Sequence, residues 1–74
     1  MMSYDDDVRA QVASILGLCI AHRKAQGLSR REVARRMITT PNHVTKLERG
    51  TSDVRLSTFL RYANAVGLDF RVVS

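Results

Sequence analysis

Hydrophobic residues near the start of the chain recur every three or four positions, as they do along one face of an α-helix. They are Val8, Val12, Ile15, Leu16, Cys19 and Ile20. Acidic residues at Asp5–Asp7 precede this stripe, and negative charge suits the first turn of a helix because the helix dipole is positive there. Gly27 suits the position just past a helix end. The pattern predicts a helix from about Asp7 to Gln26.

A second helix is predicted over residues 30–37. Ser29-Arg30-Arg31-Glu32 has the S-x-x-E form of a capping box, in which Ser and Glu each bind a backbone amide at the helix start. Apolar side chains then follow on one face, at Val33, Ala34 and Met37. The helix is short, and Ile38-Thr39 after it leaves room only for a tight turn.

A third helix is predicted to start at Thr40-Pro41 and to end before Gly50. Thr caps a helix well, and Pro is harmless at the first helical position because its missing N–H has no partner there anyway. Val44 and Leu47 form the apolar stripe of this helix. Two short helices joined by a tight turn are typical of a helix-turn-helix that reads DNA.

A fourth helix is predicted from Leu56 or Ser57 to Gly67, with inward positions at Phe59, Leu60, Ala63 and Val66. Residues 69–73 then alternate apolar and charged side chains, which predicts a short strand. Such a strand has no second strand in its own chain, so its backbone groups would pair with another copy across a two-fold axis. We therefore expect a homodimer interface at Phe70, Arg71, Val72 and Val73; a frayed tail is the alternative.

Composition and charge limit the number of domains and the kinds of partner that the chain can have. The chain has 74 residues, which is room for one domain, taken here as 1–74. Its net charge is +5, and residues 22–49 alone carry eight Lys or Arg against two Glu. This basic segment fits either a polyanionic partner or a solvated helical face. No secretory or membrane-spanning segment is recognisable, so we expect a soluble protein of the cytoplasm, associated with the nucleoid and not with a membrane.

Catalytic and metal-binding patterns are missing from the sequence. No nucleophile–base set, HExxH motif or phosphate-binding loop can be assembled, so we expect no enzyme activity and no cofactor. His22 and His43 lack further ligands at metal spacing, so we expect no metal site. Cys19 cannot form an intramolecular disulfide because it is the single cysteine, and its place in an apolar stripe favours a core role.

Residues 28–34, 37–40 and 44–50 together resemble the helix-turn-helix of the Cro and phage-repressor (XRE-type) family. The likeness extends over residues 12–73, and residues 53–67 are similar to a subset common among antitoxins. It implies an all-α, lambda-repressor-like domain of four or five helices with a short C-terminal strand. One position departs from the family: Ile38 stands where a Gly with positive φ is usual, so either the turn is strained or its backbone differs.

The resemblance also implies which residues contact DNA. The helix from Thr40 to Arg49 would enter the major groove and read bases through Thr40, Asn42, His43, Thr45 and Lys46. Phosphates would be bound by Ser29, Arg30 and Arg49. Arg23 and Glu48 match positions that form an ion pair in the family. Thr40 is also the helix cap, and the remaining arginines of the second helix fit a solvated face.

The function expected from this resemblance is a homodimeric repressor that binds a palindromic operator in double-stranded DNA. Two alternatives stay open. The chain could be an antitoxin that binds a toxin and represses its own operon. It could also be a protein-interaction module that has kept the fold without binding DNA, although the basic central segment argues against that.

Overall fold

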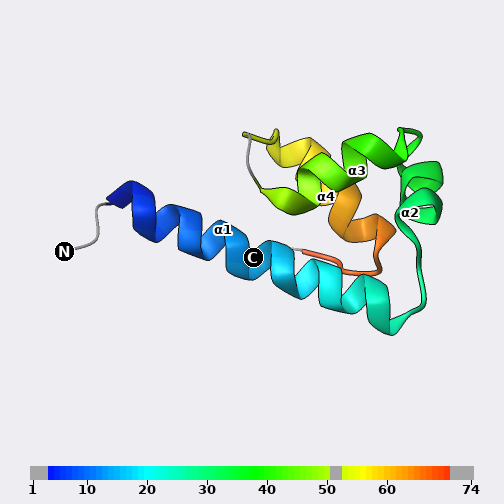
Figure 1. Cartoon of the computed structure of the whole chain (residues 1–74), viewed down its shortest axis with the longest axis horizontal. Helices are drawn as coiled ribbons and strands as arrows, with labels where there is room; N and C mark the ends of the chain where they lie inside the picture. The colour runs from blue at the N-terminus through cyan, green and yellow to red at the C-terminus, as the bar shows by residue number, and fades with distance from the viewer. Residues whose placement is uncertain (1–3, 51–52, 71–74) are drawn as a thin grey trace.

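Four helices make up the described part of the chain, which comprises residues 4–50 and 53–70 of a computed structural model (Figure 1). They are α1 (Tyr4–Ala25), α2 (Arg30–Met37), α3 (Pro41–Arg49) and α4 (Leu56–Ala65). The all-α prediction is therefore confirmed. α2 and α3 lie where their start signals predict, whereas α1 begins before the predicted Asp7 and takes Asp5–Asp7 into its first turn.

The caps of α2 and α3 form at the predicted Ser29 and Thr40, but among the described contacts only the Ser29 half of the capping box is present, because the Glu32 carboxylate pairs with Arg35 instead. The Ser29 hydroxyl accepts a hydrogen bond of 3.1 Å from the Glu32 amide, and the Thr40 hydroxyl accepts one of 3.2 Å from the His43 amide. Each bond satisfies an amide that has no partner within its helix. The two caps fix where both helices begin and so leave only residues 38–40 between them.

The turn between α2 and α3 keeps a left-handed backbone despite its isoleucine. Ile38 has φ 58° and ψ 55°, and its side chain is 88% exposed. The following Thr39 amide donates a 2.9 Å hydrogen bond to the Ala34 carbonyl, which closes the end of α2. Of the two alternatives for this turn, a strained backbone or a different one, the structure has the strained backbone. A β-branched side chain is disfavoured in the left-handed region.

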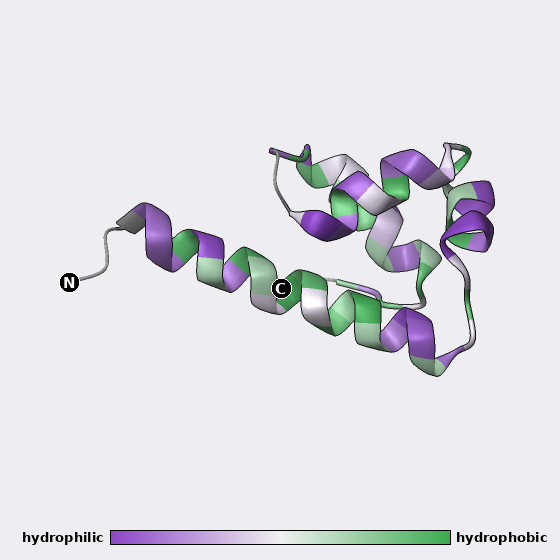
Figure 2. Ribbon diagram, in the orientation of Figure 1, coloured by the Kyte–Doolittle hydropathy of each residue, from purple (hydrophilic) through white to green (hydrophobic). Residues whose placement is uncertain are grey.

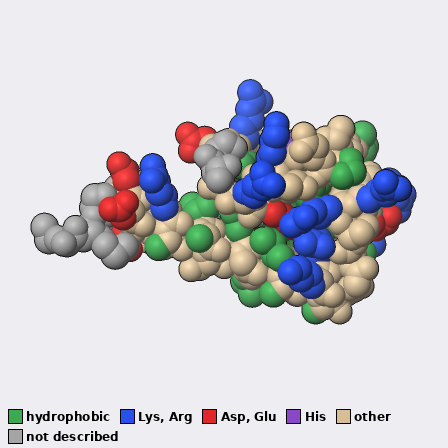
Figure 3. Space-filling view, viewed as in Figure 1, with side chains coloured by type: hydrophobic (Ala, Val, Ile, Leu, Met, Phe, Trp, Pro, Cys, Tyr) green, Lys and Arg blue, Asp and Glu red, His purple; other side chains and the backbone are tan. Residues whose placement is uncertain are grey.

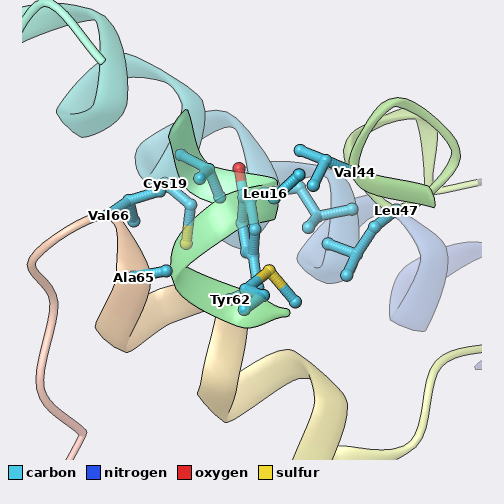
Figure 4. Packing of buried hydrophobic residues seen from close by; sticks show 10 residues of the cluster. Leu16, Cys19, Val44, Leu47, Tyr62, Ala65 and Val66 are labelled. Atoms are coloured by element: carbon cyan, nitrogen blue, oxygen red, sulfur yellow. The ribbon is translucent and has the colours of Figure 1, made fainter. Parts of the chain in front are cut away.

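The hydrophobic core lies between the four helices (Figure 4). Its fully buried members include Cys19 of α1, Val33 of α2, Val44 of α3 and Tyr62 of α4. Arg23 and Glu48 are buried with them, each only 7% exposed. Each helix therefore contributes to a shared core that also contains charge.

The apolar stripe of α1 is covered only in the second half of the helix. A helix of 22 residues is about 33 Å long, and the first half of α1 extends beyond the other three helices (Figure 1). Leu16 and Cys19 are buried, whereas Val8, Val12 and Ile15 are 38–43% exposed. Apolar residues accordingly appear along the projecting part of α1 (Figure 2). None of the helices in the described ranges has the length and hydrophobicity that a membrane crossing requires.

The predicted C-terminal strand is not shown. Asp69 and Phe70 adopt no regular secondary structure, and no strand occurs within 4–50 and 53–70. Residues 71–73, the rest of the prediction, lie outside the described residues. Leu68 packs against the core, and the ring of Phe70 lies 6.0 Å from that of Phe59 at a tilt of 41°. Phe70 therefore packs against its own chain while remaining half exposed.

Candidate nucleic-acid interface

The outer face of α3 presents three polar side chains in a row. Val44 and Leu47 turn to the core, and helical geometry therefore points positions 42, 46 and 49 away from it. Asn42, Lys46 and Arg49 are all exposed. Within the described part of the chain these three side chains form no hydrogen bond or ion pair. Their donors and acceptors are available to a ligand.

The other predicted base readers flank this row and are partly engaged within α3. Thr40 caps the helix, as described above. The Thr45 hydroxyl donates a 3.0 Å hydrogen bond to the Pro41 carbonyl, and Thr45 is half-buried. His43 Nδ1 lies 2.8 Å from the hydroxyl of Thr39. The Thr40 hydroxyl keeps its own proton to donate, whereas the Thr45 hydroxyl already donates within α3 and leaves its methyl group as the group it can offer.

A single buried carboxylate holds α3 in place. Glu48 Oε2 accepts hydrogen bonds from Arg23 Nε at 2.8 Å and from the Tyr62 hydroxyl at 2.6 Å. Its other oxygen, Oε1, accepts from Arg30 Nε at 2.8 Å and from Arg23 at 3.3 Å. We call these four residues the Glu48 cluster. Each of the four helices contributes one member, so the cluster fixes α3 relative to α1, α2 and α4.

The Glu48 cluster contains the Arg23–Glu48 ion pair that the family resemblance implies, and two partners that the sequence did not indicate. The sequence assigns Arg30 to a phosphate and indicates no role for Tyr62. A buried phenol usually needs a hydrogen-bond partner, which is the signal that Tyr62 offered. Arg23 is held further by a 2.9 Å bond from its Nη1 to the Leu28 carbonyl.

The charge states of the cluster follow from its geometry. Burial by itself raises the pKa of Glu48, but hydrogen bonds from Arg30, Tyr62 and Arg23 outweigh it and leave the pKa below its ordinary value. Burial and the neighbouring carboxylate raise the pKa of Tyr62. At neutral pH, Glu48 is therefore ionised and Tyr62 carries its proton. Burial also raises the pKa of Cys19, which suits a core thiol and not a nucleophile.

The predicted phosphate contacts lie at the start of α2 and the end of α3. The Arg30 side chain is 49% exposed, and its Nε is the atom that binds Glu48. Its two terminal nitrogens form no hydrogen bond within the described residues and can reach outward. Ser29 is exposed; its hydroxyl accepts from the Glu32 amide and keeps its own proton to donate. Ser29, Arg30 and Arg49 therefore all have donors available to a phosphate.

The remaining arginines of α2 are largely engaged within the fold. Arg35 pairs with Glu32 one turn earlier, and Arg36 donates a 3.0 Å hydrogen bond to the Ala65 carbonyl. These contacts favour the interpretation that Arg35 and Arg36 belong to a solvated helical face and do not bind phosphate. Lys and Arg side chains nevertheless gather over the helix-turn-helix half of the molecule on the face seen in Figure 3.

A family model described as helix-turn-helix matches residues 21–73, which include α2, α3 and α4 entirely. The chain belongs to the helix-turn-helix family. Because the matched family is of the XRE type, the predicted kinship with Cro and the phage repressors is confirmed. No curated protein and no solved structure matches the chain.

Membership in this helix-turn-helix family identifies the chain as a DNA-binding regulatory domain, of a kind that is not typically enzymatic. In such a domain α2 and α3 are the two helices of the motif, and α3 is the recognition helix. The exposed row lies on the second helix of that motif, and the half-exposed Arg30 lies at the start of the first.

Proposed function

We propose that this helix-turn-helix domain is a homodimeric transcriptional repressor that binds a palindromic operator through α3. The observation that carries the proposal is the contrast between the two faces of α3. One face is anchored by Val44, Leu47 and the Glu48 cluster, and the other presents Asn42, Lys46 and Arg49 without internal partners. A rigid helix with free donors is what major-groove recognition requires.

Base reading follows from the chemistry of the exposed side chains. The Asn42 amide can donate to N7 of adenine and accept from its N6 amino group, and Lys46 can donate to O6 and N7 of guanine. Thr40 and Thr45 supply methyl groups for contact with the thymine methyl. His43, at the edge of the row, contacts a base or the backbone beside it.

Phosphate contacts position the domain without reading sequence. Arg30 donates through its terminal nitrogens while Glu48 holds its Nε, and the first amides of α2 after Ser29 face the same phosphate. Arg49, at the end of α3, takes a second phosphate. Because Arg30 is bound to the same carboxylate as Arg23, the phosphate contact is coupled to the core.

Dimerisation gives the domain its second half-site. Two recognition helices related by a two-fold axis and about 34 Å apart fit successive major grooves of a palindrome. The half-exposed Phe70, with Arg71, Val72 and Val73 after it, is the proposed contact at the C-terminal end. A repressor of this kind acts in the cytoplasm, at the nucleoid.

A second candidate function is that of an antitoxin, which would bind a toxin besides its own operator. The likeness of residues 53–67 to antitoxin-type members of the family favours it. Both candidates require operator binding. A module that only binds proteins does not, so DNA binding separates it from the other two.

Selection from a pool of random duplex DNA tests the proposal. The expected product is an inverted repeat whose half-sites lie about one helical turn apart. Affinity for that repeat should fall steeply with salt, because phosphate contacts release counterions. If no sequence is enriched and the protein binds all duplexes alike, the operator-binding proposal is wrong.

A further inference from the structure

A groove of about 1190 Å³ runs between the first half of α1 and an edge formed by the end of α3, by Asp53 and Val54, and by the start of α4. Apolar side chains line both of its walls: Val8, Val12 and Ile15 on α1, and Val54, Leu56 and Phe59 opposite. Leu56 is 73% exposed, and the three α1 residues are 38–43% exposed. The groove is therefore an open apolar surface in a single chain.

The first half of α1 needs support that one chain does not give it. A helical segment of three turns is marginal in water unless its apolar face is packed. In α1 that face is covered at Leu16 and Cys19, but it continues uncovered through Val12 and Val8. The same stripe is thus buried at one end and open at the other.

We propose that α1 of a second copy of this chain fills the groove, so that two α1 helices pack antiparallel about a two-fold axis. The inference rests on the homodimer proposed above and supplies its main interface. A two-fold arrangement places the same residues on both sides, so the apolar stripe of each α1 covers the other and reaches the Val54–Phe59 wall.

Charge favours a second copy in this orientation over an unrelated apolar helix. The outer end of α1 carries Asp5–Asp7, and the exposed Arg49 at the end of α3 is among the lining residues of the groove, where its several N–H donors can bind a partner carboxylate as well as a phosphate. In an antiparallel pair the acidic turn of each copy approaches the basic end of the partner's groove, whereas a parallel pair would bring the two acidic turns together. The incoming helix also brings Arg9, and the groove wall holds Asp53 to receive it.

The groove also borders the C-terminal contact proposed above. Phe59 lines the groove and packs against Phe70, whose ring remains half exposed. An α1 helix seated in the groove would therefore lie next to Phe70. The two apolar surfaces then form one continuous interface, which a chain with so small a core would use for stability.

Sedimentation of Val12→Glu tests the interface, with Ser14→Glu as its control. Both residues are exposed in one copy, but Ser14 lies on the other side of α1. We expect the unmodified protein and Ser14→Glu to sediment as dimers. Val12→Glu should associate about 30-fold more weakly or worse, because its carboxylate would enter an apolar contact. Circular dichroism should show equal helix content for the unmodified protein and Ser14→Glu as dimers, and for the Val12→Glu monomer a loss no larger than the unpacked first half of α1.

A charge reversal tests the orientation. Replacing Asp5–Asp7 by lysines should weaken the dimer, and adding Arg49→Glu to that variant should restore it. The inference is overturned if the unmodified protein is a monomer, if Val12→Glu remains a dimer, or if Ser14→Glu dissociates as readily. It is also overturned in its antiparallel form if Arg49→Glu restores nothing.

DNA with a single half-site separates this inference from the proposed function. Val12→Glu should bind one half-site as the unmodified protein does and should lose only the added affinity for the complete palindrome. Suppose that neither the unmodified protein nor Val12→Glu binds a half-site, while Val12→Glu still dissociates in sedimentation and Ser14→Glu does not. The DNA-binding proposal is then wrong, and the proposed α1 interface is supported.

Discussion

The hydroxyl of Tyr62 donates a 2.6 Å hydrogen bond to Glu48 Oε2 and so ties α4 to the recognition helix. Arg23 of α1 and Arg30 of α2 bind the same carboxylate. The orientation of α3 therefore depends on one charged residue that sits on its buried face. Any change to Glu48 should affect stability and DNA binding together, because the side chain that anchors the helix also positions Arg30.

Replacing Glu48 by Gln should destabilise the fold by about 3–5 kcal/mol, since it leaves Arg23 buried without its counter-charge. Gln has nearly the same size, so packing is kept. Urea denaturation measures the loss. Glu32→Gln is the matched control: Glu32 pairs with the exposed Arg35, and an exposed pair is screened by water, so that variant should lose far less. Equal losses in the two variants would contradict the role given to Glu48.

The stability of the fold should decline in acid partly through Glu48. Its pKa in the folded chain lies below the ordinary value of 4.5, so its ion pairs contribute fully above pH 4.5 and are lost as pH falls through the folded pKa. Denaturation of the unmodified protein and Glu48→Gln between pH 7 and 3 checks this. The difference between the two free energies of unfolding should shrink below pH 4.5; a constant difference would show that Glu48 is not the titrating group.

Ile38→Gly should raise stability by about 1 kcal/mol. The left-handed backbone at Ile38 disfavours a β-branched side chain by roughly 1–2 kcal/mol, and its 88% exposure means that no burial is lost on removal. Ile38→Ala is the control, because alanine keeps the Cβ atom that causes the strain and should change stability much less. Thermal unfolding of the unmodified protein and the two variants measures these changes. If Ile38→Ala gains as much stability as Ile38→Gly, the gain comes from removing an exposed hydrophobic side chain and not from relieving backbone strain.

Local signals predicted the helix-turn-helix well because each acts within a few residues. The caps at Ser29 and Thr40 each need only the next turn of their own helix, so α2 and α3 were placed correctly. Periodicity likewise identified α1 as amphipathic. It could not show that α1 extends past the other helices, since the stripe through Val8 and Val12 has the same spacing whether it is covered or open.

Contacts between distant parts of the chain could not be predicted from the sequence. Tyr62 and Glu48 lie fourteen positions apart, and nothing in either segment indicates that the phenol reaches the carboxylate. Alternation over residues 69–73 predicted a strand that would pair with a second copy of the chain, and of these residues the described Asp69 and Phe70 are not in a strand. At Phe70 the contact with Phe59 explains the apolar side chain without a strand.

Asn42→Ala should weaken binding to the selected operator by about 1–3 kcal/mol and binding to random duplex DNA much less, because the Asn42 amide is proposed to read a base and not a phosphate. Asn64→Ala is the matched control: Asn64 is also exposed, but it lies on α4 and donates to the Leu60 carbonyl of its own helix. Fluorescence anisotropy with both duplexes compares the three proteins at one salt concentration, since phosphate contacts make every affinity salt-dependent. If Asn42→Ala loses affinity equally on both duplexes, Asn42 contacts the backbone, and base reading must come from Lys46 and its neighbours on α3.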